Sequence, residues 1–275
     1  MIKKISEDKY VRWIWYIFWI PLLSILLLML ILSTGLFGFM PSFEELENPK
    51  SNLATEIYSS DQVLLGTYYI QNRSNIHYSD LSPNVTNALI ATEDARFEKH
   101  SGVDLRSMFR VMTKNLLWGN RNAGGGSTIT QQLAKNLFPR DNNPNVFELV
   151  FIKLKEWITA IKLERNYTKQ EILAMYLNTV DFGSQAYGIR LASRTYYGKE
   201  PKNLTVDEAA MLIGLLKAPT YYSPVRHPER ALKRREVVLY QMKRYHYLTD
   251  EEYEKYSKIP FDRKKYRVQD QNVGL

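Results

Sequence analysis

The chain has 275 residues, enough for one sizeable domain with an anchor or for two small domains. Its composition, 45% hydrophobic and 24% charged, excludes a disordered tail, and the absence of cysteine excludes a disulfide framework, a thiolate zinc site and a cysteine nucleophile. A formal net charge of +8 suits nucleic acid, an anionic membrane surface or a phosphorylated substrate, and it does not choose among them.

The first predicted element is a transmembrane anchor at residues 13–40. This stretch has no charged side chain, and about 20 apolar residues are enough for a helix to cross a bilayer. Basic residues in the tail at 1–12 and three glutamates after the anchor predict a cytoplasmic N-terminus and an exported remainder. A cleaved signal peptide is the alternative, but the apolar run is longer than its usual hydrophobic region. An exported domain also argues against nucleic acid as a partner.

Residues 41–80 are predicted to form a connector. Within it, the short β-branched and aromatic stretches 54–58 and 63–70 predict a small β-hairpin. Residues 81–258 show mainly helical signals, and a polar, linker-like tail follows at 259–275. The exported part therefore reads as one mainly α domain.

Helix starts are marked by local capping chemistry. Ser82 precedes Pro83, a pattern typical of an N-cap followed by the first helical residue. Thr168 and Thr205 each stand three residues before a glutamate, which is a capping box. A long helix is expected from Asn145 to Glu164.

A carboxylate, an aromatic ring and an imidazole follow the first of these helices. On a continuous helix, Glu93, Phe97 and His100 would share one face. A partly buried carboxylate in such a setting can serve as a general base. A solvated, charged helix end is the alternative, and spacing alone favours it.

Residues 105–118, which follow the segment with Glu93 and His100, form an amphipathic stretch. Apolar side chains alternate with Arg106, Arg110 and Lys114, as in a helix that lies in a bilayer interface. An ordinary core helix has the same periodicity, so both interpretations stay open.

Three glycines at 124–126 lead into Ser127 and Thr128, which can begin a helix. Backbone N–H groups of such a loop can approach an anion. The spacing is not that of a Walker loop, because Gly125 stands where the phosphate-binding lysine belongs. The following helix carries an unusually amide-rich polar face, formed by Gln131, Gln132, Lys135 and Asn136. A mobile loop with an ordinary cap is the alternative.

The long helix carries a cation and a carboxylate one turn apart, Lys153 and Glu156. A surface ion pair of this kind is common and stabilises a helix by only a few tenths of a kcal/mol. Alone, this pair indicates little about the function of the protein.

Taken in order, these motifs resemble the peptidoglycan glycosyltransferase family. The match runs through Glu-Asp-x-x-Phe-x-x-His-x-Gly, Gly-Gly-Ser-Thr-Ile-Thr-Gln-Gln-x-x-Lys-Asn, Lys-x-x-Glu and Lys-Gln-Glu-Ile-Leu-x-x-Tyr-Leu-Asn, and ends with Gly-Leu-Leu-Lys-Ala-Pro. The family comprises monofunctional transglycosylases and the glycosyltransferase domain of class A penicillin-binding proteins. The resemblance covers residues 81 to about 245, and it implies a lysozyme-like, mainly α domain on a single transmembrane helix in the bacterial plasma membrane.

The resemblance also implies an activity. The substrate would be lipid II, whose sugars are added to a growing glycan strand with inversion and release of polyprenyl diphosphate. Glu93 would be the general base, and Glu156 the second catalytic-site carboxylate. A divalent cation, Mg²⁺ or Mn²⁺, would accompany the diphosphate. The matching substrate-site positions are Asp94, Phe97, His100, Ser127, Thr128, Gln131, Gln132, Lys135, Asn136 and Lys153.

One position departs from the family pattern. The third motif usually begins with Arg-Lys, and here Ile152 precedes Lys153, so Lys155 or Arg165 are the candidates to replace the missing cation. Two alternatives from the residues remain: a lysozyme-like hydrolase, which has no use for Lys135 or Lys153, and a catalytically silent scaffold for other cell-wall synthesis proteins. No transpeptidase motif follows the anchor, which leaves open a monofunctional enzyme or part of a bifunctional one.

Overall fold

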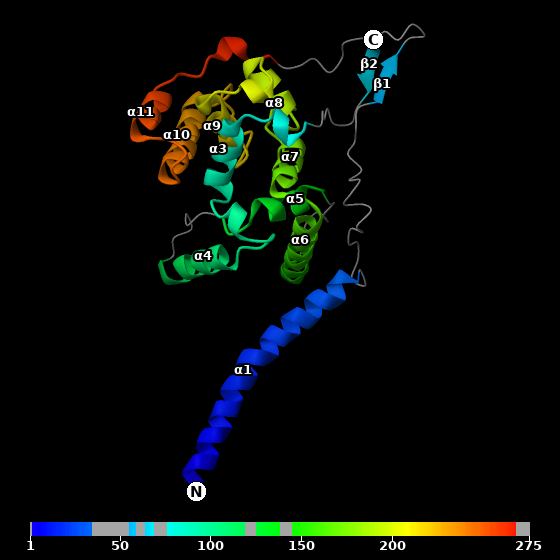
Figure 1. The fold of residues 1–275 in the computed structure, drawn as a ribbon, viewed down its shortest axis with the longest axis vertical. Helices are drawn as coiled ribbons and strands as arrows, with labels where there is room; N and C mark the ends of the chain where they lie inside the picture. The colour runs from blue at the N-terminus through cyan, green and yellow to red at the C-terminus, as the bar shows by residue number, and fades with distance from the viewer. Residues whose placement is uncertain are drawn as a thin grey trace.

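The computed structural model describes residues 2–34, 55–58, 64–68, 76–118, 125–137 and 145–267. Helices dominate this part of the chain, as the sequence predicts (Figure 1). The α-helices are α1 (Ile2–Ser33), α3 (Pro83–Glu93), α4 (Leu105–Trp118), α5 (Ile129–Leu137), α6 (Val146–Asn166), α7 (Lys169–Thr179), α8 (Ile189–Tyr197), α9 (Val206–Leu215), α10 (Pro228–Arg244) and α11 (Asp250–Ser257). Short 3-10 helices are η1 (Tyr78–Asp80), η2 (Phe97–Lys99), η3 (Pro201–Asn203) and η4 (Arg263–Lys265).

The predicted helix starts are confirmed where the capping chemistry is local. Ser82 accepts a hydrogen bond from the backbone N–H of Asn84, and Pro83 is the first residue of α3. At α7, Thr168 and Glu171 form a reciprocal capping box. These contacts satisfy backbone N–H groups that have no partner inside the helix.

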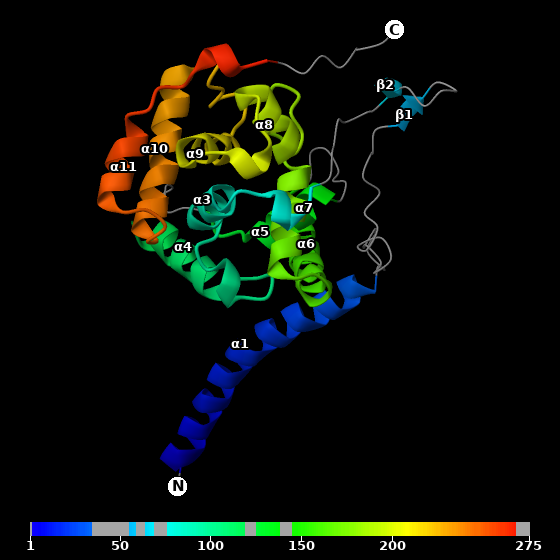
Figure 2. The ribbon, with the colours of Figure 1, turned by 45° about the horizontal axis from the view of Figure 1, so that its top comes forward.

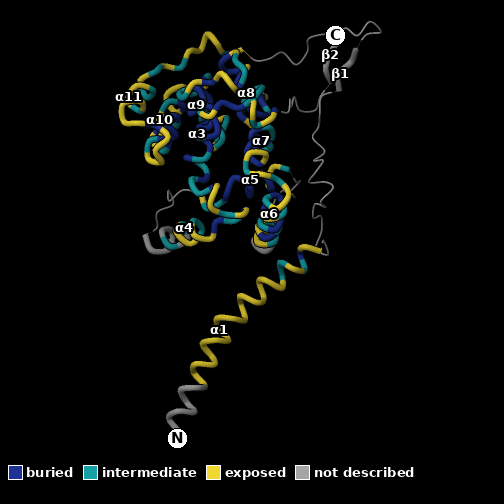
Figure 3. Tube along the Cα trace, in the orientation of Figure 1, coloured by how far each residue is buried: buried dark blue, intermediate teal, exposed yellow. Residues whose placement is uncertain are grey.

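The main core is built around α9. Every residue of α9 from Glu208 to Leu215 is buried, and the helix packs chiefly against α3 and α10 (Figure 2). A second group of helices forms where α5 packs against α6 and α7. Buried residues run continuously through both groups, so that one core holds α3 and α5 in fixed relative positions (Figure 3).

Helix α1 extends away from this core and is exposed along most of its length (Figures 1 and 3). Residues Lys9–Ser33 form the one helix in the described chain that is long and apolar enough to cross a membrane. Its last turns pack on α6 in a separate hydrophobic cluster, in which Leu32, Leu154 and Ile158 are buried. Residues 35–40, the end of the predicted anchor, lie outside the described part.

Two short strands lie in the predicted connector. β1 (Thr55–Tyr58) and β2 (Leu64–Tyr68) pair antiparallel, with Thr55 opposite Tyr68. Residues 59–63, which would form the turn, lie outside the described residues, as does most of the remaining connector.

The segment after α11 continues to pack on the helical domain. Phe261 contacts the ring of Tyr197 edge-on, and the backbone N–H of Arg267 donates to the Thr195 carbonyl. The buried Arg235 guanidinium donates to the carbonyls of Ser257 and Ile259. The domain therefore extends beyond the predicted boundary at residue 258, at least to residue 267.

Candidate active site

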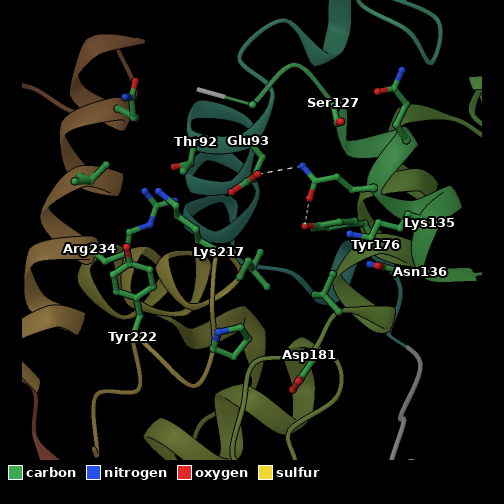
Figure 4. Close-up of a pocket in the computed structure, with 18 of the residues that line it drawn as sticks. Thr92, Glu93, Ser127, Lys135, Asn136, Tyr176, Asp181, Lys217, Tyr222 and Arg234 are labelled. Carbon is green, nitrogen blue, oxygen red and sulfur yellow. Dashed lines mark hydrogen bonds between the residues drawn. The ribbon is translucent and has the colours of Figure 1, made fainter. Parts of the chain in front are cut away.

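An open cleft of about 1070 Å³ lies between two groups of helices (Figure 4). One wall consists of α5, α6 and the middle of α7, and the other of the segment after α9 together with α10. Glu93, the last residue of α3, lies between these walls, with Lys135 and Asn136 on one side and Arg234 and Tyr222 on the other (Figure 4).

The Glu93 carboxylate is held by a chain of hydrogen bonds. Gln132 of α5 donates from Nε2 to Glu93 Oε2 at 3.0 Å, and its Oε1 accepts from the Tyr176 hydroxyl at 2.9 Å. Tyr176, on α7, is 2% exposed. Burial, together with the nearby charge of Glu93, raises the pKa of the Tyr176 hydroxyl far above its ordinary value, so the hydroxyl keeps its proton.

Eight of the predicted site residues line the cleft. They are Glu93, Ser127, Gln131, Gln132, Lys135, Asn136, Lys153 and Glu156. The structure thus brings together the first, second and third motifs, which are separated by up to 63 positions in the chain.

The other four predicted site residues lie behind the cleft wall, so their role in substrate contact stays a prediction. Asp94 accepts from His100 Nε2 at 2.9 Å and from the backbone N–H of Ile129, the first residue of α5, at 3.1 Å. Thr128 donates to the Gly102 carbonyl at 2.6 Å, and Phe97 is fully buried. These contacts tie the end of α3 to the start of α5, and so fix Glu93 relative to Gln132.

The expectation that Glu93, Phe97 and His100 share a helical face is wrong. Helix α3 ends at Glu93, Phe97 lies in η2, and His100 has an extended backbone. Further along the loop, Gly102 has a φ of +93°, which suits glycine, and a Cβ there would lie 2.8 Å from the Ala160 backbone of α6. The loop therefore lies directly against α6 and does not continue α3.

The α5–α6 wall carries two cations, Lys135 and Lys153, and one buried amide, Gln131. Lys135 is exposed, and Lys153 Nζ lies 2.7 Å from Glu156 Oε2, with the lysine half-exposed and the glutamate 6% exposed. Gln131 is buried, and its Nε2 has no hydrogen-bond partner among the residues that the structure describes. A buried donor that lines a cleft and lacks a partner is ready to bind a ligand.

The opposite wall carries three cations to which the sequence motifs assigned no role: Lys217, Lys233 and Arg234. The guanidinium of Arg234 lies 5.9 Å from the ring centroid of Tyr222, and its buried Nε has no hydrogen-bond partner within the described chain. Lys217 belongs to the Gly-Leu-Leu-Lys-Ala-Pro motif, so the sequence held a signal for it. Arg234 follows no such motif, and only the packing of α10 against α3 and α9 brings it to the cleft.

The missing cation at Ile152 is not replaced from its own helix. Among the candidates near it, Lys153 lines the cleft, whereas Ile152, Lys155 and Arg165 do not. On the opposite wall, Lys233 and Arg234 of α10 line the cleft.

The described residues do not form a metal site of their own. They contain no group of three or more histidine, aspartate or glutamate side chains placed to hold a metal ion. The cleft carboxylates Glu93, Glu156 and Asp181 accept hydrogen bonds from Gln132, Lys153 and the backbone N–H of Gly183, respectively. The described residues by themselves therefore offer no preformed metal site, and the divalent cation expected with the diphosphate stays a prediction.

Comparison with known proteins adds an independent finding. Residues 61–243 match the protein family described as Transglycosylase. The chain is 41% identical over 250 residues to penicillin-binding protein 1A of Aquifex aeolicus, covering 88% of this chain and 34% of that protein. It is 42% identical over 188 residues to penicillin-binding protein 1F of Bacillus subtilis, covering 68% and 26%.

Among solved structures, penicillin-binding protein 1A from Haemophilus influenzae matches 80% of this chain and 22% of that chain, with a TM-score of 0.44 and 23% identity. The chain thus spans about a third or less of the length of the relatives it matches.

Proposed function

The chain belongs to the transglycosylase family, and on that premise we propose that it is a peptidoglycan glycosyltransferase that polymerises lipid II into glycan strands. The observation that carries the proposal is the position of Glu93, a hydrogen-bonded carboxylate at the end of α3 between two cationic walls of one cleft. The reaction joins two molecules that each carry a diphosphate. Two cationic walls on either side of one base are what such a reaction needs.

Glu93 acts as the general base in this proposal. It takes the proton from the acceptor's sugar hydroxyl while that oxygen attacks the anomeric carbon of the growing strand, and the polyprenyl diphosphate leaves from the opposite face. The bond to the sugar oxygen forms as the bond to the diphosphate breaks, and the configuration inverts. A base for this step has to lie within hydrogen-bond reach of the hydroxyl, and Glu93 lines the cleft and is partly exposed.

The lysines stabilise the leaving group. A diphosphate departs as an anion, so it needs positive charge rather than an acid to protonate it. Lys135 and Lys153 of the α5–α6 wall supply that charge, and Glu156 holds the Lys153 ammonium in place. Glu156 is therefore a positioning carboxylate, and Lys217 and Arg234 bind the second diphosphate on the opposite wall.

No step of this scheme depends on a divalent cation that the protein itself holds. We propose that Mg²⁺ or Mn²⁺ arrives bound to the diphosphate, because such ions commonly bind through substrate phosphates with few protein carboxylates. Titration calorimetry separates this from a preformed site: Mg²⁺ added to the protein alone should give no binding heat.

One end of the molecule supports our proposal for how the protein lies on the membrane. The last turns of α1, the start of α6 and α4 all lie at this end (Figures 1 and 3). Leu105 and Phe109 of α4 are 69% and 65% exposed, and Leu149 and Val150 of α6 are also exposed. We infer that this end faces the bilayer, with the N-terminus in the cytoplasm, so that the cleft receives substrates whose lipid tails stay in the membrane.

The experiment is polymerisation of labelled lipid II by the purified chain in liposomes. Formation of long glycan with release of the lipid diphosphate supports the proposal. Shortening of added glycan would instead favour a hydrolase, and binding of lipid II without any product would favour a scaffold. Other cell-wall synthesis proteins are the partners that a scaffold would recruit.

A further inference from the structure

The hydrogen-bond chain behind Glu93 crosses three helices. Tyr176 on α7 donates to Gln132 Oε1 on α5, and Gln132 Nε2 donates to Glu93 Oε2 at the end of α3 (Figure 4). Tyr176 is almost fully buried although it lines the cleft, so little of its surface is open to water as an alternative partner. The two bonds, of 2.9 and 3.0 Å, thus form a continuous link from the core to the cleft.

The direction of this link depends on the charge of the carboxylate. A glutamine amide has a donor end and an acceptor end, and a charged carboxylate can only accept. With its oxygen facing the Tyr176 hydroxyl, Gln132 presents its donor end to Glu93, which stabilises the charged carboxylate. The reversed amide would present its oxygen to Glu93, which repels the charged form and accepts from the protonated one.

We propose that Tyr176 is a positioning residue, which acts through Gln132 to hold Glu93 in the orientation and charge state that accept a proton. The inference rests on the proposed function, because it assigns a device to the base of that reaction. Tyr176 does not itself touch the reacting atoms. Its hydroxyl stays protonated because burial and the charge of Glu93 raise its pKa, so it remains a donor throughout the working pH range.

Removing the hydroxyl should shift the pH dependence of activity. Without the donor from α7, the Gln132 amide loses the contact that directs its oxygen away from Glu93, and the charged base becomes populated only at higher pH. The other charged groups that line the cleft are Lys135, Lys153, Glu156, Asp181, Lys217, Lys233 and Arg234. Substitution of Tyr176 changes none of them, so a shift would report on the link.

The experiment measures kcat/KM for lipid II against pH in wild type and Tyr176→Phe. We expect the acid limb to move up by about one pH unit in Tyr176→Phe, with activity recovering at higher pH. Tyr196→Phe is the matched control, because Tyr196 is also fully buried and bonded through its hydroxyl, to the Phe182 carbonyl and Ser184, outside the cleft lining. It should lose comparable thermal stability and keep the wild-type pH profile.

A second variant keeps the inference testable should Tyr176→Phe fold poorly. Gln132→Met has a similar shape and breaks both bonds, so it should show the same shift, and Tyr176→Phe should add nothing to it. An unchanged acid limb in both variants, or additive effects in the double variant, would overturn the inference. An inactive wild type would instead count against the proposed function, so the two failures are distinct.

Discussion

Lys153 and Glu156 form a 2.7 Å ion pair on successive turns of α6, with the carboxylate buried and the ammonium facing the cleft. This geometry makes Glu156 the fixed partner and Lys153 the charge that is available to a ligand. The pair therefore holds the ammonium at the edge of the cleft, where a ligand can reach it.

The leaving-group role predicts that charge at Lys135 and Lys153 matters more than shape. Lys135→Ala and Lys153→Ala should each lower turnover, Lys135→Arg should retain part of it, and Lys135→Gln should not. Initial rates of lipid II polymerisation at saturating substrate measure this. Lys155→Ala, also on α6 but outside the cleft lining, is the control and should be near wild type. Full activity of Lys135→Gln would contradict the role.

The general-base role predicts that Glu93→Gln lowers polymerisation by about 10²-fold or more, because the amide keeps the shape but cannot take a proton. Melting temperature should change little, since an active-site carboxylate is seldom a stabilising group. Glu98→Gln is the matched control: it removes a neighbouring exposed carboxylate that does not line the cleft. Near-normal turnover of Glu93→Gln would show that another group is the base.

Local chemistry was predictable from the sequence, and the geometry of the site was only partly so. Ser82 and Thr168 cap their helices because an N-cap needs only its own next few residues. The break after Glu93 was missed because Asp94 bonds His100 and the backbone N–H of Ile129, and a periodicity argument assumes that the helix continues. Neither Asp94 nor His100 looks like a helix stop when only spacing is considered.

The cleft wall that α10 helps to form could not be predicted from local sequence patterns. Arg234 follows Glu93 by 141 positions, and its side chain reaches the cleft only because α10 packs on α3 and α9. In the sequence it is one cation in a helix rich in both charge signs, which indicates a solvated face. The same limit applies to Tyr176, whose link to Glu93 depends on the packing of α5 against α7.

The hydrogen bonds that Asp104 accepts lead us to expect a pH dependence of the protein's stability. Burial raises the pKa of its carboxyl, but hydrogen bonds from the Ser107 hydroxyl and backbone N–H and from Arg96 outweigh burial and hold the pKa below its ordinary value. A lowered folded-state pKa stabilises the protein above the unfolded-state value of about 3.9, and this contribution disappears as the pH falls through the folded-state pKa. Asp104 lies just before α4, where such a carboxylate contributes about 0.5–2 kcal/mol.

Asp104→Ala should therefore have a lower melting temperature than wild type at pH 7, with the difference shrinking below about pH 4. Thermal unfolding followed by circular dichroism between pH 7 and pH 2.5 measures the difference. Asp250→Ala removes an exposed carboxylate from the first turn of α11 and should have a smaller effect. A difference for Asp104→Ala that stays constant down to pH 2.5 would mean that its charge is not the source.

The last prediction concerns the end of the molecule inferred to face the bilayer. Removing residues 1–40 should leave a folded domain, because the main core contains no residue of α1. It also uncovers Leu154 and Ile158 of α6, which α1 covers in the full chain. The truncated protein therefore offers liposomes two apolar surfaces, the uncovered patch on α6 and the exposed side chains of α4, and a test has to separate them.

Ser substitutions at Leu105 and Phe109 separate them, because both side chains are exposed and neither leaves a cavity when replaced. In the truncated protein and in the full chain, this double variant should keep its melting temperature. The truncated form should bind anionic liposomes more weakly than its parent, and added salt should weaken the parent's binding further. Tyr247→Ser is the control, because it replaces an exposed aromatic side chain in the connection between α10 and α11. This variant should bind liposomes as the parent does.

Leu105 and Phe109 are the substituted positions because both side chains are described and exposed. If α4 were instead a core helix, the double variant would unfold at a markedly lower temperature, because it would open a cavity and bury two hydroxyls. Trp157 of α6 packs against the same patch as Leu154 and Ile158. Liposome binding that is unchanged in the α4 variant but lost with Trp157→Ser would assign membrane contact to this patch and not to α4.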